Sequence, residues 1–363
     1  MSPETGDAPG RSTMLPPIAA DRILGCLLGG AVGDALGAPV EFTSLRDIRA
    51  EHGDLGVRDF VAGAWPAGTF TDDTQMTLFT AEGLIRAENR RRTTGQADPA
   101  HVLWHAYLGW LHTQGERVPW DETGPPGWLV KEPVLQARRA PGTTCLAALS
   151  RRAPGSVERP HNNSKGCGGV MRVAPIGLVG ADPFQLGVAA AAITHGHPSG
   201  YLAAGCFARL VARVSRGHDL RESAVEAIEL TSARPGADET RAALSHALDL
   251  ASLADTPGPR VVERLGAGWI AEEALAISVY CALVAHDFAS GVLLAVNHSG
   301  DSDSTGAITG NLLGAALGVE AIPISWRRRL HGHEVVERVA RDLVQQFAEP
   351  ATTPFDPDRY PPW

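Results

Sequence analysis

The sequence feature that most constrains the fold is an acidic stretch at residues 300–306, which reads Gly-Asp-Ser-Asp-Ser-Thr-Gly. It places the carboxylates of Asp301 and Asp303 one residue apart, directly before a run (307–317) whose apolar residues recur at helical spacing. One acidic residue at a helix N-terminus is ordinary, because the first amides lack partners and the helix dipole favours negative charge there. A cap needs only one of them, so the second carboxylate indicates a further role.

Two more acidic segments stand far upstream. Asp72 and Asp73 precede a second helical pattern, and Glu41 follows a short break punctuated by glycine and proline. If the three segments converge, five carboxylates share one place: those of Glu41, Asp72, Asp73, Asp301 and Asp303. Each unscreened pair about 4 Å apart would repel by roughly 4 kcal/mol at an effective dielectric constant near 20. Bound cations would remove that cost.

The order of these segments resembles the ADP-ribosylglycohydrolase family, over about residues 23–318. The segments that carry the resemblance are Gly33-Asp34-Ala35-Leu36-Gly37 with Glu41, Thr71-Asp72-Asp73-Thr74, residues 163–175, Thr194-His195-Gly196-His197-Pro198, and residues 300–306. None is decisive alone, whereas five in the family's order are specific. The resemblance implies a hydrolase that removes ADP-ribose from a modified residue.

Composition favours a large helical protein. The chain has 363 residues, of which 44% are hydrophobic and 20% charged, so it can bury a substantial core in one large domain or two small ones. Aromatic residues are scarce while alanine and glycine are abundant. This favours closely packed helices over a β-sandwich, because small residues let helix axes approach and alanine has the best helix propensity. We predict one compact all-α domain of orthogonal helices at residues 18–348, with a dinuclear metal cleft at converging helix ends. A disordered tail (1–17) and a Pro-rich tail (349–363) flank it.

Charge and cysteine content exclude several classes of function. A net charge of -9 argues against a nucleic-acid surface, which wants a basic field. The five cysteines are scattered and odd in number, so they indicate neither a disulfide framework nor a zinc site, and reduced thiols fit a cytoplasmic protein. Because residues 1–17 lack an apolar core and no long apolar run follows, we expect no signal peptide and no membrane span. We expect a monomer.

Local patterns give three further expectations. The first helical stripe should end near Gly33, which leaves Asp34 in a tight turn where a carboxylate bonding the backbone is favoured over a metal ligand. Residues 44–65 should be irregular, with glycines marking turns. The Gly- and Pro-rich loop at 113–141 is either functional or mobile, and whether it borders a substrate cleft is left open.

Every candidate metal ligand offers oxygen. The set is Thr71, Asp72, Asp73, Asp301, Asp303 and Ser304. All-oxygen sites select hard cations such as Mg²⁺ or Mn²⁺, and zinc and copper are disfavoured. Four aspartates exceed what one Mg²⁺ takes from a protein, so we predict two Mg²⁺ ions (Mn²⁺ is the alternative) about 3.5 to 4 Å apart, with Asp303 as the bridge. The competing interpretation is three unrelated helix caps.

Glycoside cleavage needs one carboxylate to deprotonate water and one acid to protonate the leaving group. We predict Asp72 or Asp73 as the metal-bound base or orienting group and Glu41 as the mobile acid or base. The assignment among them stays open.

A Gly-rich segment is the candidate for substrate binding. Its residues are Ser164, Lys165, Gly166, Cys167, Gly168 and Gly169. Glycines let backbone amides approach a ligand, and consecutive amides beside a lysine make a nest for a diphosphate, although such a turn is as readily a packing device. The resemblance implies that this loop contacts ADP-ribose and that His195 does so too.

The hypothesis is a metal-dependent hydrolase acting on an ADP-ribosylated protein or conjugate, with arginine favoured over serine or O-acyl linkage. Many relatives carry an acidic residue shortly before a Thr pair that corresponds to Thr143 and Thr144, whereas here Arg138 and Arg139 stand close before it, so that spot gives no support for a linkage. Two alternatives are a catalytically silent, ADP-ribose-binding or structural relative, and a Mg²⁺-dependent phosphohydrolase.

Overall fold

The computed structural model describes residues 18–118, 120, 124–180, 182–253, 256–347 and 354–363, and within them every regular element is a helix. The one β-type contact in these ranges is an isolated antiparallel bridge between Gly166 and Ile270. The predicted all-α class is therefore confirmed. The predicted N-terminal tail, 1–17, lies outside the described residues.

The α-helices are α1 (Ala20–Gly37), α2 (Leu45–His52), α3 (Asp72–Thr94), α4 (Pro99–Thr113), α6 (Thr143–Leu149), α7 (Ala174–Val179), α8 (Pro183–Ala192), α9 (Pro198–Val214), α10 (Leu220–Ser232), α11 (Asp238–Leu250), α12 (Pro259–Val262), α13 (Ala271–Val284), α14 (Phe288–Val296), α15 (Ser302–Leu317), α16 (Ile324–Arg329) and α17 (His333–Phe347). Short 3₁₀ turns are η1 (Ala38–Val40), η2 (Trp128–Lys131), η3 (Pro133–Leu135), η4 (Cys167–Gly169), η5 (Glu263–Leu265) and η6 (Val319–Ala321).

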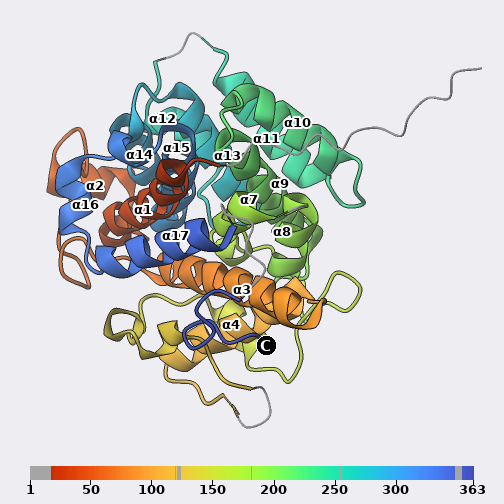
Figure 1. Ribbon diagram of the computed structural model, residues 1–363. Helices are drawn as coiled ribbons and strands as arrows, with labels where there is room; N and C mark the ends of the chain where they lie inside the picture. The colour runs from red at the N-terminus through yellow and green to blue at the C-terminus, as the bar shows by residue number, and fades with distance from the viewer. Residues whose placement is uncertain (1–17, 119, 121–123, 181, 254–255, 348–353) are drawn as a thin grey trace, which may run out of the picture.

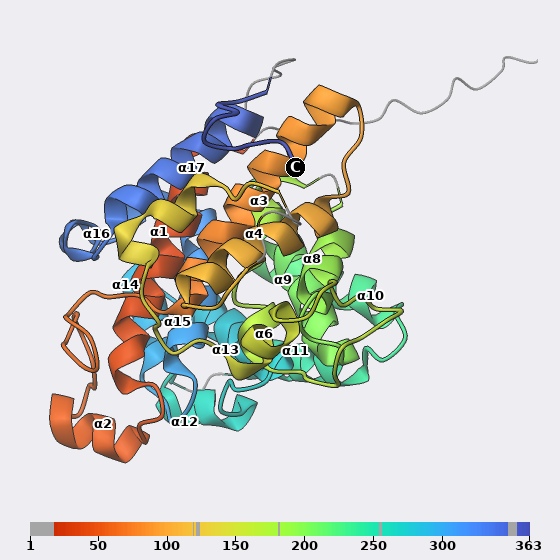
Figure 2. The same cartoon turned by 90° about the horizontal axis from the view of Figure 1, so that it is seen from below.

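The centre of the fold is the contact between α1 and α15, which lie side by side although they come from opposite ends of the chain (Figures 1 and 2). Each helix presents glycine at every fourth position, and residues four apart share one helix face. These glycines are Gly25, Gly29 and Gly33 on α1 and Gly314, Gly310 and Gly306 on α15, which face one another in that order. The two helices are therefore antiparallel and meet backbone to backbone.

The antiparallel contact sets the position of both helix ends. At the end of α1, Gly37 lies against the backbone of Ser302 at the start of α15. Glu41 follows α1 after the turn η1, and Asp301 is the N-cap residue of α15. The contact therefore brings two of the predicted acidic segments to the same end of the helix pair.

The other helices cover this pair. Helices α13 and α14 pack on α15, α17 and α3 pack on α1, and α4 pairs with α3. Helices α7, α8 and α9 form a second group, with α10 and α11 beside α9 (Figure 1). The third acidic segment enters through α3, whose N-terminus holds Asp72 and Asp73.

Two of the local expectations were wrong. Helix α1 continues past Gly33 to Gly37, so Asp34 is a buried helical residue and does not lie in a turn. The helix persists because its glycines face α15 and are held by that contact. Residues 45–52 form α2, capped by the side chain of Ser44, within the stretch expected to be irregular.

The C-terminal residues 354–363 pack against α3 and α4, so the described fold extends beyond the predicted boundary at residue 348. Tyr360 is fully buried and donates a hydrogen bond of 2.6 Å to Asp342 of α17. Trp363 stacks on His105 of α4, with ring centroids 4.0 Å apart.

The long loop before α6 carries two tryptophans that pack against aromatic rings of other segments. Trp120 packs edge-on against His105 and His112, and Trp128 packs against Tyr360. Neither tryptophan lines the acidic cavity described below, whereas Ala140 does.

One stretch of the described residues, Ala20–Val40, is long and apolar enough to cross a membrane by length and composition, although no such run was expected. Of its most apolar window, 83% is buried inside the protein. Helix α1, which makes up most of this stretch, packs against α15 at the centre of the fold, and a helix buried in this way is apolar on most of its faces.

Gly310→Ala should destabilise the protein, although alanine is the better helix former by about 1 kcal/mol. The added methyl group would fall on the carbonyl oxygen of Gly29, which cannot move without separating α1 from α15. We expect a loss of about 2 to 3 kcal/mol in the free energy of unfolding, measured with urea. In the control Gly258→Ala the nearest atom outside the adjoining residues, the Thr256 carbonyl oxygen, is 4.0 Å from the new methyl group, so stability should change little. A gain in stability for Gly310→Ala would contradict the close contact.

Candidate active site

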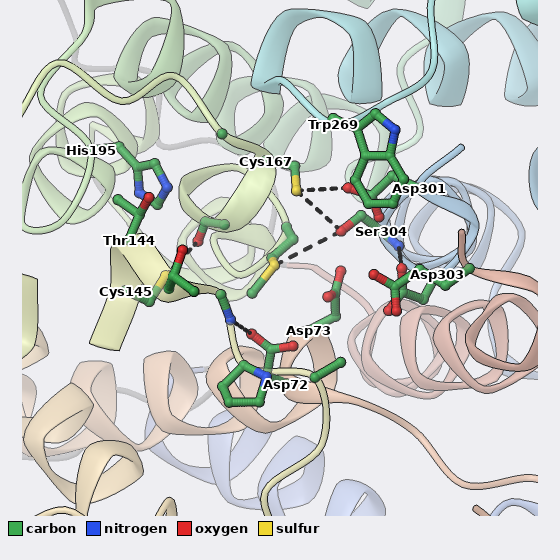
Figure 3. A pocket seen from close by; sticks show the side chains of 18 of the residues that line it. Asp72, Asp73, Thr144, Cys145, Cys167, His195, Trp269, Asp301, Asp303 and Ser304 are labelled. Carbon is green, nitrogen blue, oxygen red and sulfur yellow. Dashed lines mark hydrogen bonds between the residues drawn. The ribbon is translucent and has the colours of Figure 1, made fainter. Parts of the chain in front are cut away.

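A cavity of about 420 Å³ opens where the N-termini of α3, α6 and α15 meet the turn after α1 and the segment around η4 (Figure 3). Its lining residues include all five predicted carboxylates: Glu41, Asp72, Asp73, Asp301 and Asp303. The predicted convergence of the three acidic segments is therefore what the structure shows. The roles assigned to these residues stay predictions.

Three of the carboxylates form the tightest group. Glu41, Asp301 and Asp303 each offer an oxygen, and these atoms all lie within 4.8 Å of one another. Figure 3 shows the carboxylates of Asp72 and Asp73 on the neighbouring side of the same space. Carboxylate oxygens at this spacing are suited to a hard divalent cation.

The N-terminus of α3 is held by a buried carboxylate from α1. Asp34 accepts hydrogen bonds from the backbone N–H of Thr71 (2.8 Å) and of Thr74 (3.0 Å). It also accepts from both threonine hydroxyls, at 2.9 and 2.6 Å. The Asp34 carboxylate, from another helix, thus takes the place of an N-cap side chain and fixes the turn that carries Asp72 and Asp73.

The hydroxyl-bearing candidates lie beside the carboxylates. The Thr71 hydroxyl is 3.2 Å from Asp303 as well as being bonded to Asp34, and it is absent from the cavity lining. The backbone N–H of Ser304 donates to Asp303 at 2.9 Å, and the Ser304 side chain lines the cavity. Ser304 is therefore placed to meet a ligand, whereas Thr71 lies behind Asp303.

The two aspartates at the start of α3 have different surroundings. Asp72 accepts a hydrogen bond of 3.2 Å from the backbone N–H of Gly142. Asp73 is only 3% exposed, and its Oδ1 atom has no hydrogen-bond partner among the described residues. A buried carboxylate oxygen without a donor is costly, so this atom points to a missing cation or proton.

Burial in the cavity favours the protonated acids. It raises the pKa of Asp72, Asp73 and Asp301 well above the usual value, and the charge of Asp303 raises each further. The same two causes, burial first, raise the pKa of Glu41 to about 10. Without a cation the cavity therefore retains protons at neutral pH.

The Gly-rich segment contributes part of the opposite wall. Gly166, Cys167 and Gly168 line the cavity, whereas Gly169 and Ser164 do not. The Ser164 hydroxyl lies 3.2 Å from that of Thr144, which does line it. Three of the segment's six predicted binding residues thus face the space directly.

Lys165 is directed elsewhere. Its ammonium donates to Glu239 at 2.7 Å and to Glu272 at 2.5 Å, and it does not line the cavity. The predicted combination of an amide nest with a free lysine is therefore not what the structure shows. Its ion pairs tie the Gly-rich segment to α11 and α13.

His195 lies at the far side of the cavity from Asp303 (Figure 3). Burial, with the nearby Arg172 guanidinium as a second cause, lowers the pKa of His195 to about 3. Its Nδ1 atom is 2.8 Å from the hydroxyl of Thr194. The imidazole is therefore neutral and can exchange hydrogen bonds with a substrate, but it brings no positive charge.

Sequence reasoning missed the aromatic edge of the cavity. Phe42, directly after Glu41, stacks on Trp269 with ring centroids 4.8 Å apart, and both line the space. Phe42 has a φ of 66°, in the left-handed region that residues with large side chains rarely adopt, and its side chain is 75% exposed. No local pattern predicts it, because the partner lies more than two hundred residues away.

Arg139, close before the Thr pair, has a structural role. Its guanidinium donates to the carbonyl of Phe70 at 3.1 Å and lies over the Phe70 ring, while its own carbonyl accepts from the Asp72 N–H at 3.1 Å. This arginine supports the turn before α3.

Helix ends on an all-α scaffold thus gather five carboxylates around one cavity, and three of them could together hold a metal ion. Residues 15–352 match the family model described as ADP-ribosylglycohydrolase. The chain belongs to the ADP-ribosylglycohydrolase family, whose members hydrolyse ADP-ribose linkages, and it is an enzyme of that class.

Relatives and a solved structure agree with this assignment. The chain is 31% identical to an uncharacterised protein of Archaeoglobus fulgidus, over 90% of this chain and 96% of that one. It is 29% identical to the ADP-ribosyl-[dinitrogen reductase] glycohydrolase of Rhodospirillum rubrum, over 87% and 92%. It is 25% identical to the ADP-ribosylarginine hydrolase Tri1 of Pseudomonas putida, over 92% and 81%. A solved ADP-ribosylglycohydrolase-related protein complex shares 29% identity with a TM-score of 0.62, covering 90% of this chain and 98% of that one.

Asp34→Asn should weaken metal binding without removing any cavity carboxylate. The asparagine amide has only one acceptor oxygen, so some of the N–H and hydroxyl groups of Thr71 and Thr74 lose their hydrogen-bond acceptor. We expect a loss of about 2 to 3 kcal/mol in the free energy of unfolding. Because the turn holding Asp72 and Asp73 is loosened, Mn²⁺ affinity measured by calorimetry should fall about 10- to 100-fold. The control Asp98→Asn changes an exposed N-cap of α4, where asparagine caps equally well, and should leave both quantities unchanged. Unaltered metal affinity in Asp34→Asn would contradict the positioning role.

The metal-free protein should lose stability as the pH rises from about 7.5 to 8.5. The unfolded chain has already lost these carboxyl protons, whereas the raised pKa values keep some of them on the folded state, so stability falls as pH rises. Each retained proton costs about 1.4 kcal/mol per pH unit. His195, with its pKa lowered to about 3, is neutral in the folded state throughout this range.

Urea unfolding in EDTA at several pH values measures this slope. Asp303→Asn removes a charge that raises the neighbouring pKa values, so it should flatten the slope. Saturating Mg²⁺ should stabilise the protein more at the higher pH, because the ion competes with protons. A metal-free stability that rises over this range would contradict the prediction.

Proposed function

We propose that this enzyme uses two divalent cations, Mg²⁺ or Mn²⁺, to release ADP-ribose from a modified protein residue, with arginine as the favoured linkage. The observation that carries the proposal is the cavity with its five carboxylates, two of them on α3 and two at the start of α15. The relatives from R. rubrum and P. putida, named for ADP-ribosylated dinitrogen reductase and for ADP-ribosylarginine, support the substrate class.

The residues present fit a metal pair. Asp73 leaves a buried oxygen without a donor, and Glu41, Asp301 and Asp303 gather oxygens within 4.8 Å. Asp303, whose charge acts on Asp72, Asp73 and Asp301 alike, is the candidate bridging ligand. Ser304 completes the donor set, and Thr71 supports Asp303 from behind.

When bound, the cations supply positive charge that polarises the ribose hydroxyls and an attacking water. The chain's own groups do the rest. Asp72, held by the Gly142 N–H, is fixed in orientation and suits a carboxylate that positions water. Glu41 follows α1 on a short turn and stays partly exposed, and its raised pKa lets it hold a proton for the leaving group.

The other wall would hold the ADP-ribose. Gly166, Cys167 and Gly168 would contact it, and the neutral His195 offers it hydrogen bonds without charge. The N–H groups of Gly166 and Cys167 already donate to the Ser164 hydroxyl and the Trp269 carbonyl. The exposed Phe42–Trp269 stack closes one edge of the cavity and would exclude water from the scissile bond.

Product analysis tests the proposal. The protein is incubated with an arginine-ADP-ribosylated protein, with a serine-linked one, with ADP-ribose and with NAD, each with Mg²⁺, Mn²⁺ or EDTA, and products are identified by mass spectrometry. Intact ADP-ribose released from the arginine substrate, and lost in EDTA, is the expected result. AMP as product would indicate a phosphohydrolase, and binding without turnover a catalytically silent relative.

Asp303→Ala should abolish turnover and the binding of the second metal ion. Removal of a bridging ligand should cost at least about 100-fold in kcat, more than the usual effect of residues that only orient a ligand. Steady-state kinetics and metal content by mass spectrometry measure the two effects. The control Asp219→Asn removes one charge from the exposed N-cap of α10 and should match the unmodified protein. Full activity with normal metal content in Asp303→Ala would refute the assignment.

A further inference from the structure

One side chain at the acidic end of the cavity differs chemically from the oxygen donors around it. The thiol of Cys167 donates to Asp301 Oδ2 at 2.9 Å, and its Sγ atom is 3.6 Å from the hydroxyl of Ser304. Figure 3 shows this sulfur directed at both side chains, across the cavity from Asp72. A soft sulfur donor thus touches two residues of the predicted hard-cation site.

The backbone fixes the position of this sulfur. The N–H of Cys167 donates to the carbonyl of Trp269 at 3.2 Å, next to the bridge between Gly166 and Ile270. Its carbonyl accepts from the N–H of Val170, which closes the turn η4. Pre-positioning of this kind is what a ligand group needs, because little freedom is lost when an ion binds.

A second observation points independently to a missing ligand in this space. The Oδ1 atom of Asp73 is buried and has no donor among the described residues, and Figure 3 shows the Asp73 carboxylate directed into the cavity, between Asp72 and Asp303. Three further carboxylates, from Glu41, Asp301 and Asp303, lie within one ion's reach of each other. The Cys167 sulfur therefore belongs to a cluster of acidic side chains that a bound cation would neutralise.

We propose that Cys167 acts as a thiolate ligand, so that the acidic end of this cavity also binds a thiophilic divalent cation such as Zn²⁺ or Co²⁺, through sulfur and through Asp301. The ion takes the place of the thiol proton, which leaves to solvent, and no electrons are transferred. Two atoms bound to one tetrahedral Zn²⁺ at about 2.3 and 2.0 Å lie about 3.5 Å apart. The sulfur and Asp301 Oδ2 would have to separate by about 0.6 Å from their 2.9 Å, within reach of a small side-chain rotation.

Binding of a thiophilic ion would be a property of this cavity separate from the proposed hydrolysis. A thiophilic ion held by Cys167 and Asp301 competes with the hard ion expected at Asp301, so Zn²⁺ would displace it. Binding of this ion depends on the arrangement of the donors and needs no cleavage of an ADP-ribosyl bond.

Titration of the metal-free protein with Co²⁺ tests the proposal, because thiolate-to-cobalt charge transfer gives a near-ultraviolet absorption band. One equivalent of Co²⁺ should produce the band, and Zn²⁺ should bleach it. Cys167→Ser should lose the band and bind Zn²⁺ at least about tenfold more weakly in competition with a chromophoric chelator. The matched control is Cys145→Ser, which removes another thiol of the same cavity, one that lies 3.6 Å from the Arg172 guanidinium, and it should keep the band.

A second variant separates ligand loss from misfolding. Cys167→Asp offers oxygen in place of sulfur, so Co²⁺ should bind with a d–d spectrum but without the charge-transfer band. The proposal is overturned if the unmodified protein shows no band, if Cys167→Ser keeps it, or if Cys145→Ser loses it. These spectra are read without substrate, so their failure leaves the proposed hydrolysis standing. Conversely, a protein with the band that releases no ADP-ribose overturns only the hydrolysis.

Discussion

The backbone contact between α1 and α15 is the constraint on which the site depends. The glycine faces let the two helices approach until the carbonyl of one lies where a side chain of the other would be. Because the helices are antiparallel, the C-terminal end of α1 meets the N-terminal end of α15, and Glu41 comes beside Asp301 and Asp303. Any change that separates the helices would move Glu41 away from Asp301 and Asp303.

The same constraint places the third acidic segment. Asp34 lies on α1 one residue after Gly33, and it reaches α3 through Thr71 and Thr74. A single helix therefore sets both the distance to α15 and the position of the α3 turn. Ionised carboxylates held this close repel one another, so the scaffold holds them at a cost in free energy. Protons relieve that cost, and bound cations would relieve it as well. The raised pKa values and the candidate metal site therefore have the same cause, which is the close approach of several carboxylates in one cavity.

Sequence was sufficient for the helical class and for the convergence of the acidic segments, because carboxylates at three helix ends have few common explanations. It was insufficient for Asp34, since Gly33 directly before it and Gly37 three residues after it are typical of a turn. The glycine repeat from Gly25 to Gly37 was the signal that could have extended the helix. The partners of Lys165, Glu239 and Glu272, stand 74 and 107 residues away in the chain, and only the assembled fold reveals such ion pairs.

The charge balance of the cavity bears on how an ADP-ribosyl group can enter. Among the described residues no lysine or arginine lines the space, Lys165 is paired with two glutamates, and His195 is neutral. A diphosphate approaching those carboxylates of the cavity that are ionised would be repelled. Cations bound at the acidic end would reverse the local field and give the substrate a positive end to approach. In a cavity built this way, bound ions would serve recognition as well as chemistry, because none of the lysines and arginines among the described residues lines it.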